Sequence, residues 1–311
     1  MKAGVLAAGL ALAAMSAAAQ TYKPVAPRAD DLARCDTVEA AQLRANCRLV
    51  YGIPGLVLPS APEAFDPLAV AHMALYKPAG DGPFPAVVLL PTCGGIGQHL
   101  LYWAKHALAE GYAVLILDSL FQRGLPTTCT VASPVPTLAL RSRDAYDTLA
   151  YLATLPFIDP KRVAAMGLSE GARVSLLVTS AGNARTYSPK GLRFAAVVDL
   201  YGRCFEPRTG QAFLRPDADL PLLALMGARD ADGDPAECLP RLEAAKARGA
   251  PVEWRVFPSI AHAWDQEGFR TAETVTLAGG VSVIMFYSAE ITEESRALVF
   301  AFLAKQLKRA P

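Results

Sequence analysis

The 311-residue chain is poor in histidine and carries almost no net charge. It contains only four histidines, and 30 Lys and Arg residues balance 29 Asp and Glu residues to a formal net charge of +1. No run of basic residues is present, so the sequence offers no electrostatic footprint for nucleic acid or for an anionic membrane surface. Its six cysteines form neither a C-x-x-C motif nor a cluster with histidine, and we therefore expect no metal site.

The N-terminus has the pattern of a secretory signal peptide. A single cation, Lys2, precedes the apolar run Ala3–Met15, and the small residues Ser16–Ala19 follow. This order predicts cleavage before Gln20 and export to the periplasm or the medium. The run is short for a membrane span and no cluster of Lys or Arg follows it, so we expect no membrane attachment after cleavage. The predicted organisation is a signal peptide (1–19), an N-terminal extension (20–67) and a main domain (68–311).

The cysteines all lie after the predicted cleavage point, and they are Cys35, Cys47, Cys93, Cys129, Cys204 and Cys238. An even number in an exported chain favours disulfides. Closeness along the chain suggests that Cys35 pairs with Cys47. The pairing of the other four depends on the fold.

Apolar runs and helical patterns alternate along the main domain. The expected strands are Ala69–Leu75 at an edge, Pro85–Leu90, Tyr112–Leu117, Arg162–Met166, Phe194–Leu200, Leu220–Met226 and Val252–Phe257. The expected helices between and after them are His99–Glu110, Thr137–Leu155, Gly171–Ser180, Ala236–Arg248 and Glu293–Lys308. This alternation predicts an α/β fold with a mostly parallel central sheet and helices on both faces.

Three further segments carry more specific expectations. The N-terminal extension is expected to hold one short helix near Asp31–Arg48, and Thr292 is expected to cap the last helix. The segment Thr271–Tyr287 interrupts the path to that helix, and we expect it to be an inserted hairpin or an active-site flap.

Ser169 lies in a G-x-S-x-G motif, Gly167-Leu168-Ser169-Glu170-Gly171. An apolar strand enters the motif and a helical pattern leaves it, which is the context of the nucleophile elbow of α/β-hydrolases. The glycines remove side chains that would collide in the sharp turn, and the serine hydroxyl then stands exposed above the sheet. Ser169 is therefore the candidate nucleophile.

His262 is the candidate base, because a serine hydroxyl is a poor nucleophile until its proton is removed. In this fold the triad runs in the order Ser, acid, His. The other histidines, His72, His99 and His106, all precede Ser169, whereas His262 follows the strand that ends near Phe257.

The acid is less constrained, since several aspartates lie between Ser169 and His262. Asp230 follows the apolar run that ends at Met226, at the carboxyl end of the penultimate strand, and is the preferred candidate. Asp199 ends an earlier strand and is the alternative.

Acyl transfer also needs donors for the developing oxyanion. The backbone N–H of Glu170, directly after the nucleophile, is one candidate. The second is expected from the glycine-containing loop Pro91–Gly95 after the first buried strand, with the N–H of Cys93 as the candidate.

Taken together, these segments resemble the dienelactone hydrolase family of α/β-hydrolases over about residues 85–307. The segments that carry the resemblance are PTCGG at 91–95, DSLFQRG at 118–124, VAAMGLSEGA around Ser169, PLLALMGARD around Asp230 and FPSIAHAWD around His262. Two departures matter: founding members have Cys at the nucleophile position, and they hold a Glu where this chain has Thr92.

The resemblance implies a carboxylic ester hydrolase that acts on a small-molecule ester without a cofactor. Similarity to exported members also implies a Cys204–Cys238 disulfide. In the fold that the resemblance implies, Cys93 and Cys129 both lie near the site, and we expect them to pair. Arg123 in DSLFQRG is a possible contact for a substrate carboxylate, although a structural ion pair is the favoured role. The alternatives that stay open are a serine peptidase or amidase on the same fold and a non-catalytic exported binding protein.

Overall fold

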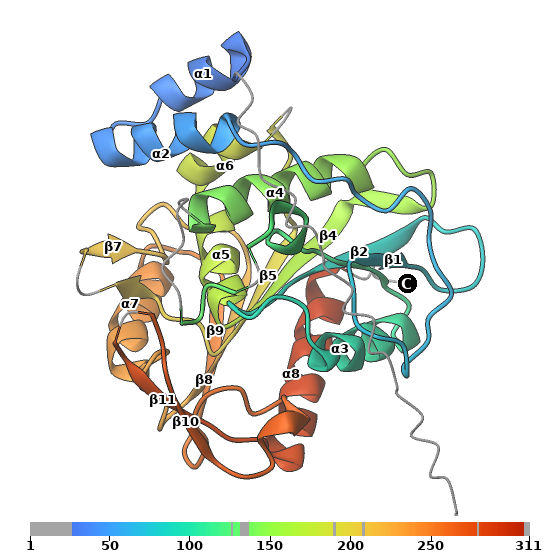
Figure 1. Cartoon of the computed structure of the whole chain (residues 1–311), viewed down its shortest axis with the longest axis vertical. Coiled ribbons are helices and arrows are strands. Elements are labelled where there is room, and N and C mark those ends of the chain that lie inside the picture. The colour runs from blue at the N-terminus through green and yellow to red at the C-terminus, as the bar shows by residue number, and fades with distance from the viewer. Residues whose placement is uncertain are drawn as a thin grey trace, which may run out of the picture.

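A seven-stranded sheet forms the centre of the computed structural model, which describes residues 27–125, 127–130, 137–188, 191–206, 209–278 and 280–307. The strand order is β1-β3-β2-β4-β5-β8-β9 (Figure 1). β1 runs antiparallel to β3, and every other neighbouring pair is parallel. The strands are β1 (Ala74–Tyr76), β2 (Phe84–Leu90), β3 (Ala113–Ile116), β4 (Ile158–Leu168), β5 (Ala196–Leu200), β8 (Leu222–Gly227) and β9 (Val252–Phe257).

Both faces of the sheet are buried, which explains why its strands are continuous apolar runs rather than alternating ones. Along β2, Val88 and Leu90 belong to one hydrophobic core, whereas Val87 and Leu89 belong to the other. Successive side chains of a strand point to opposite faces, so a strand buried on both sides must be apolar at every position.

Helices cover the two faces in separate groups (Figure 1). α4 (Thr137–Leu152), α5 (Glu170–Val178) and α7 (Pro235–Ala247) contribute to the core that contains Val88. α3 (Gln98–Ala109) and α8 (Ala289–Leu307) contribute to the core that contains Val87. The α/β-hydrolase arrangement predicted from the sequence is confirmed.

The N-terminal extension contains two helices, α1 (Ala29–Asp36) and α2 (Ala41–Tyr51), so the expectation of one helix over this stretch was wrong. The break between them lets the predicted Cys35–Cys47 disulfide join the two helices. α1 and α2 lie over α4 and α6 (Ala181–Tyr187) at one end of the molecule (Figure 1).

Two element boundaries also differ from expectation. The edge strand is only Ala74–Tyr76, because β3 pairs with those three residues alone. α8 begins at Ala289, and Ser288 rather than Thr292 occupies its start, where the Ser288 hydroxyl accepts a hydrogen bond from the N–H of Ile291 at 3.3 Å. Thr292 lies inside the helix, and its hydroxyl donates to the carbonyl of Trp264 at 2.8 Å.

The segment before α8 is an antiparallel hairpin of β10 (Glu273–Thr276) and β11 (Ser282–Met285), as the first of the two expectations had it. A second, shorter hairpin is formed by β6 (Phe205–Glu206) and β7 (Gln211–Ala212). Single turns of 3-10 helix lie at Phe121–Arg123 and Glu267–Phe269.

Within the described ranges, no helix has the length and apolar character needed to cross a membrane. The predicted signal peptide lies outside the described residues.

Candidate active site

Ser169 occupies a strained turn between β4 and α5. Its backbone φ of +55° lies in a region that residues other than glycine seldom adopt. The two motif glycines allow the turn, because a Cβ on Gly167 would lie 2.1 Å from the Gly171 carbonyl oxygen, and one on Gly171 would lie 2.0 Å from the Leu90 carbonyl oxygen. The elbow geometry predicted from the sequence is therefore present.

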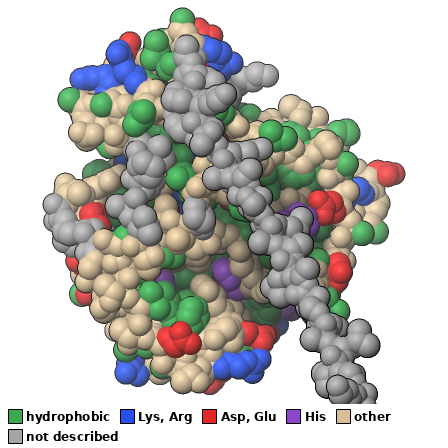
Figure 2. All heavy atoms as spheres, viewed as in Figure 1, with side chains coloured by type: hydrophobic (Ala, Val, Ile, Leu, Met, Phe, Trp, Pro, Cys, Tyr) green, Lys and Arg blue, Asp and Glu red, His purple; other side chains and the backbone are tan. Residues whose placement is uncertain are grey.

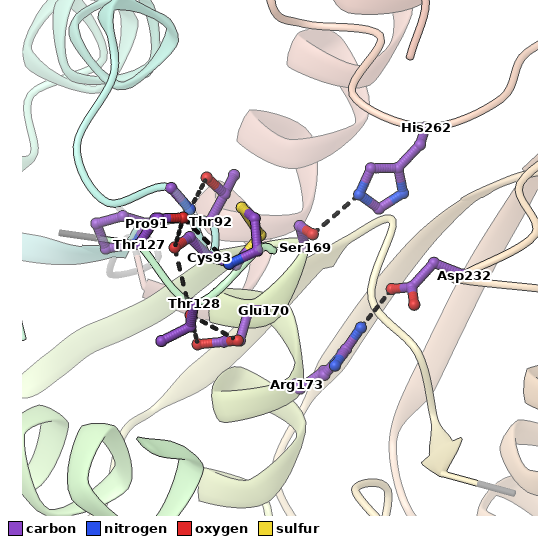
Figure 3. Close-up of a disulfide and its surroundings, with 12 residues drawn as sticks. Pro91, Thr92, Cys93, Thr127, Thr128, Ser169, Glu170, Arg173, Asp232 and His262 are labelled. Atoms are coloured by element: carbon purple, nitrogen blue, oxygen red, sulfur yellow. Dashed lines mark hydrogen bonds and ion pairs between the residues drawn. A yellow bond between two sulfur atoms is a disulfide. The ribbon is translucent and has the colours of Figure 1, made fainter. Parts of the chain in front are cut away.

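His262 connects Ser169 to Asp230 by hydrogen bonds. Its Nε2 lies 2.9 Å from the Ser169 Oγ, and its Nδ1 lies 2.7 Å from the Asp230 Oδ2. All three side chains are almost fully buried. Ser169 and His262 point toward one another in Figure 3.

The hairpin β10–β11 holds the backbone of His262 in place. The His262 N–H donates to the carbonyl of Ile284 at 3.0 Å, and the His262 carbonyl accepts from the N–H of Phe286 at 3.1 Å. The inserted segment whose role was open in the sequence thus supports the loop that carries the candidate base.

Asp230, and not Asp199, reaches His262. Asp199 ends β5, is almost fully buried, and accepts a hydrogen bond from the Gly202 N–H at 2.8 Å through one carboxylate oxygen. Its other oxygen has no hydrogen-bond partner among the described residues. Burial, together with the nearby charge of Asp230, raises the pKa of Asp199 to about 7.

The electrostatic environment of His262 raises the pKa of its imidazole. Burial lowers the pKa of His262, but the charge and the hydrogen bond of Asp230 outweigh burial, so this pKa lies above its ordinary value of 6.5. Asp232 contributes to the same effect and is itself held by Arg173 and Arg203, the latter at 3.0 Å. A histidine poised in this way can take a proton from Ser169 and be stabilised as the imidazolium.

Sequence reasoning missed a group of buried side chains that packs against His262. The ring of Tyr201 meets the His262 ring edge to face at a centroid distance of 4.8 Å, and its hydroxyl donates to Asp265 at 2.7 Å. Trp103 donates to the other Asp265 oxygen at 2.7 Å. Tyr201 directly follows the predicted strand Phe194–Leu200, at the carboxyl edge of the sheet. This position is the sequence signal that could have indicated a residue near the site.

The loop with Cys93 is attached to the start of α5 through side chains. The predicted Cys93–Cys129 disulfide is present, and the N–H of Thr128 donates to the Cys93 carbonyl at 2.8 Å. The Thr128 hydroxyl lies 3.0 and 3.1 Å from the two carboxylate oxygens of Glu170. Arg141 donates to Glu170 at 2.8 Å and also to the Pro91 carbonyl. Figure 3 shows Cys93, Thr128 and Glu170 on one side of Ser169, opposite His262.

The two candidate oxyanion donors lie in this network. Among the described residues, neither the N–H of Cys93 nor that of Glu170 donates a hydrogen bond to another protein group. Sequence reasoning selected both backbone groups but missed the side chains of Glu170, Thr128 and Arg141 that connect them. No short sequence motif joins these three positions, so only the fold brings them together.

Arg123 is buried in a structural ion pair. Its guanidinium nitrogens lie 2.7 and 2.9 Å from the two oxygens of Asp144, and it also donates to the carbonyls of Ser119 and Pro54. The ion pair favoured from the sequence is therefore present. The third predicted disulfide, Cys204–Cys238, is present as well.

Comparison with known proteins gives a family for the whole main domain. The dienelactone hydrolase family model matches residues 72–307. A protein of Methylorubrum extorquens is 25% identical over 201 residues, which are 60% of this chain and 65% of that protein. A protein of Escherichia coli K12 is 23% identical over 202 residues, 60% of this chain and 70% of that protein. Both are named "Putative carboxymethylenebutenolidase". The matched region spans less than two thirds of the Methylorubrum protein.

Solved structures share the fold at low sequence identity. The esterase Est2 of Thermogutta terrifontis superposes with a TM-score of 0.57 at 16% identity, covering 80% of this chain and 93% of the esterase. The dienelactone hydrolase-like promiscuous phosphotriesterase P91 from metagenomic libraries superposes with a TM-score of 0.54 at 18% identity, covering 78% and 95%. The family model matches well over half of the residues of this chain, and the chain therefore belongs to the dienelactone hydrolase family.

Proposed function

We propose that the protein is a serine hydrolase that cleaves a carboxylic ester. The observation that carries the proposal is the unbroken hydrogen-bonded line from Ser169 through His262 to Asp230, with lengths of 2.9 and 2.7 Å. This arrangement supplies a nucleophile, a base and a group that orients the base.

In the proposed mechanism, Ser169 Oγ attacks the ester carbonyl carbon while His262 Nε2 takes the hydroxyl proton. The carbonyl oxygen becomes negatively charged, and the N–H groups of Cys93 and Glu170 stabilise it by hydrogen bonds. The intermediate collapses, the C–O bond to the alcohol breaks, and His262 returns the proton to the leaving alcohol. Asp230 stabilises the imidazolium throughout.

The acyl-enzyme is then hydrolysed by the same groups. His262 removes a proton from a water molecule, whose oxygen attacks the acyl carbon. A second tetrahedral intermediate collapses to the free acid, and the proton returns to Ser169 Oγ. Membership of the dienelactone hydrolase family supports ester cleavage, and the names of the two curated relatives refer to a butenolide, which is a cyclic ester.

The proposal is tested with 4-nitrophenyl acetate and purified protein. We expect turnover by the wild type, and a fall of at least about 10³-fold in kcat for Ser169→Ala and for His262→Ala. A matched amide, 4-nitroacetanilide, separates esterase from amidase activity. Equal or faster cleavage of the amide would move the function to an amidase, and a folded wild type that cleaves neither substrate would contradict the proposal.

We also propose that the protein is exported. The N-terminal pattern and three disulfides support this localisation, since disulfides persist in oxidising compartments. The N-terminus of the protein recovered outside the cytoplasm should begin at Gln20. An intact Met1 would contradict cleavage.

A further inference from the structure

A cavity of about 820 Å³ lies between two segments that flank the candidate active site. Thr92 and Gly94–Gly97 line it from the loop that contains Cys93, and Asp265–Phe269 line it from the segment that follows His262. Its walls include the apolar or aromatic side chains of Ile96, Leu101, Phe269 and Tyr287. The volume is within the range of small-molecule pockets.

Buried arginines around the site are paired within the protein. Arg141 lies 2.8 Å from Glu170, and Arg203 lies 2.9 Å from Glu206 and 3.0 Å from Asp232. Arg173 is paired with Asp232 as well (Figure 3). A guanidinium that already has a buried carboxylate partner cannot turn to a substrate carboxylate without leaving that partner unpaired, which is costly.

Arg123, the cation that the sequence suggested for a substrate carboxylate, is paired in the same way. Both oxygens of Asp144 hold it, and the side chain is only 6% exposed. It is therefore not available as an anion receptor.

The buried charge at the cavity wall is negative, and the cations near it are exposed. Asp265 lies on the cavity wall, and both of its oxygens accept hydrogen bonds from neutral donors, Trp103 and Tyr201. Glu267 lines the cavity too, and its carboxylate is paired with Arg270 at 2.5 Å. The exposed Lys105 is the basic residue among the described lining residues. Burial lowers the pKa of His99, another lining residue, so its imidazole is neutral near pH 7.

Figure 2 shows one face of the molecule, on which histidine side chains are recessed among hydrophobic and uncharged ones, with acidic side chains on the lower part of the same face. A carboxylate bound in the cavity would lose much of its hydration, and the cation it could meet among the described lining residues, Lys105, is exposed, where an ion pair contributes little.

From these contacts we infer the substrate class: an uncharged carboxylic ester whose larger group occupies the cavity between residues 92–97 and 265–269. This inference rests on the proposed esterase function. Esters that carry a carboxylate on that group are poor substrates.

Two substrates of the same shape test the charge. They are the mono-4-nitrophenyl ester of adipic acid, which ends in a carboxylate, and the 4-nitrophenyl ester of adipamic acid, which ends in a carboxamide. We expect kcat/KM for the carboxamide to exceed that for the carboxylate by at least about 10-fold at pH 8, which corresponds to about 1.4 kcal/mol. Equal values, or a preference for the carboxylate, would overturn the inference.

A substitution at Ile96 tests the location. Ile96→Lys places a cation on the cavity wall, and it should raise the carboxylate-to-carboxamide ratio of kcat/KM by about 10-fold over the ratio for Ile96→Met, a neutral side chain of similar length. An unchanged ratio in a folded Ile96→Lys variant would show that the substrate does not occupy this cavity. Turnover of 4-nitrophenyl acetate is measured in parallel: its absence in the wild type contradicts the proposed function itself, whereas its presence with a preference for the carboxylate contradicts only the inference.

Discussion

The carboxylate of Glu170 accepts a hydrogen bond from the hydroxyl of Thr128, and this contact connects the start of α5 to the loop with Cys93. The N–H of the same threonine donates to the Cys93 carbonyl at 2.8 Å. One residue therefore bridges the two backbone groups that we propose as oxyanion donors. The Cys93–Cys129 disulfide, and Arg141 through Glu170 and the Pro91 carbonyl, connect the same two segments.

Thr128→Val should weaken the proposed oxyanion site without altering the nucleophile. Valine keeps the shape of threonine but cannot donate to Glu170, so the buried carboxylate loses a partner. We expect kcat to fall by about 10-fold with little change in KM, less than the 10² to 10³ typical of losing a donor outright. Thr276→Val, in the exposed hairpin, is the control. A Thr128→Val variant with wild-type kcat would show that the bridge does not position the donors.

Removal of the Cys93–Cys129 disulfide should affect catalysis more than removal of Cys35–Cys47. The first disulfide holds the loop beside Ser169, whereas the second joins α1 to α2 in the N-terminal extension. We expect Cys93→Ala/Cys129→Ala to lower kcat by at least about 10-fold, and Cys35→Ala/Cys47→Ala to lower stability by about 2 to 4 kcal/mol while kcat is retained. The measurements are ester turnover and urea unfolding. A fall in kcat of the same size in both variants would contradict a specific role for the first disulfide.

Activity should disappear at acidic pH through protonation of His262. The base must be neutral to accept the Ser169 proton, and the pKa of His262 in the folded chain lies above 6.5 because Asp230 outweighs burial. The acidic limb of the kcat/KM profile should therefore have its midpoint above pH 6.5. A midpoint below 6 would mean that the imidazole is not stabilised by Asp230 in the free enzyme.

Asp230→Asn and Asp199→Asn separate the two candidate acids. Asparagine at 230 cannot stabilise the imidazolium, so kcat should fall by about 10³- to 10⁴-fold. Asparagine at 199 still offers an oxygen to the Gly202 N–H, and kcat should stay within about 3-fold of wild type. The opposite ranking would make Asp199 the acid.

Asp199→Asn should also change the pH dependence of stability. The pKa of Asp199 rises from 3.8 to about 7 on folding because of burial. The native state therefore holds this proton more tightly, and the stability it contributes is complete below pH 3.8 and is lost as the pH rises through about 7. The variant avoids that loss and should be more stable than wild type by on the order of 2 to 4 kcal/mol at pH 8, but not at pH 4. The measurement is the free energy of unfolding of wild type and variant at pH 4 and at pH 8. The same difference between the two proteins at both pH values would contradict a raised pKa of Asp199.

The central fold and the line from Ser169 to Asp230 follow from the sequence because their signals are local. Each strand is a short apolar run, and the elbow is a five-residue motif whose glycines are required by contacts under 2.2 Å. Chain order alone selected His262 from four histidines.

The parts that could not be predicted depend on contacts between distant segments. Glu170 and Thr128 are 42 residues apart, and Tyr201 and Asp265 are 64 apart, so no periodicity or motif relates them. The two-helix form of the N-terminal extension was missed although the predicted Cys35–Cys47 disulfide requires a break. Twelve residues of one α-helix would place the two Cα atoms about 18 Å apart, whereas they lie 5.5 Å apart. The support that β11 gives to His262 was invisible for the same reason, since it consists of backbone hydrogen bonds.

Covalent labelling of Ser169 tests the central claim most directly. A fluorophosphonate reacts with a serine only when a neighbouring base activates it, and mass spectrometry of the digested protein locates the adduct. We predict one label per chain, on Ser169, that is absent from Ser169→Ala and strongly slowed in His262→Ala. A folded wild-type protein that stays unlabelled, or a label on another residue, would contradict the assignment of Ser169 as the nucleophile.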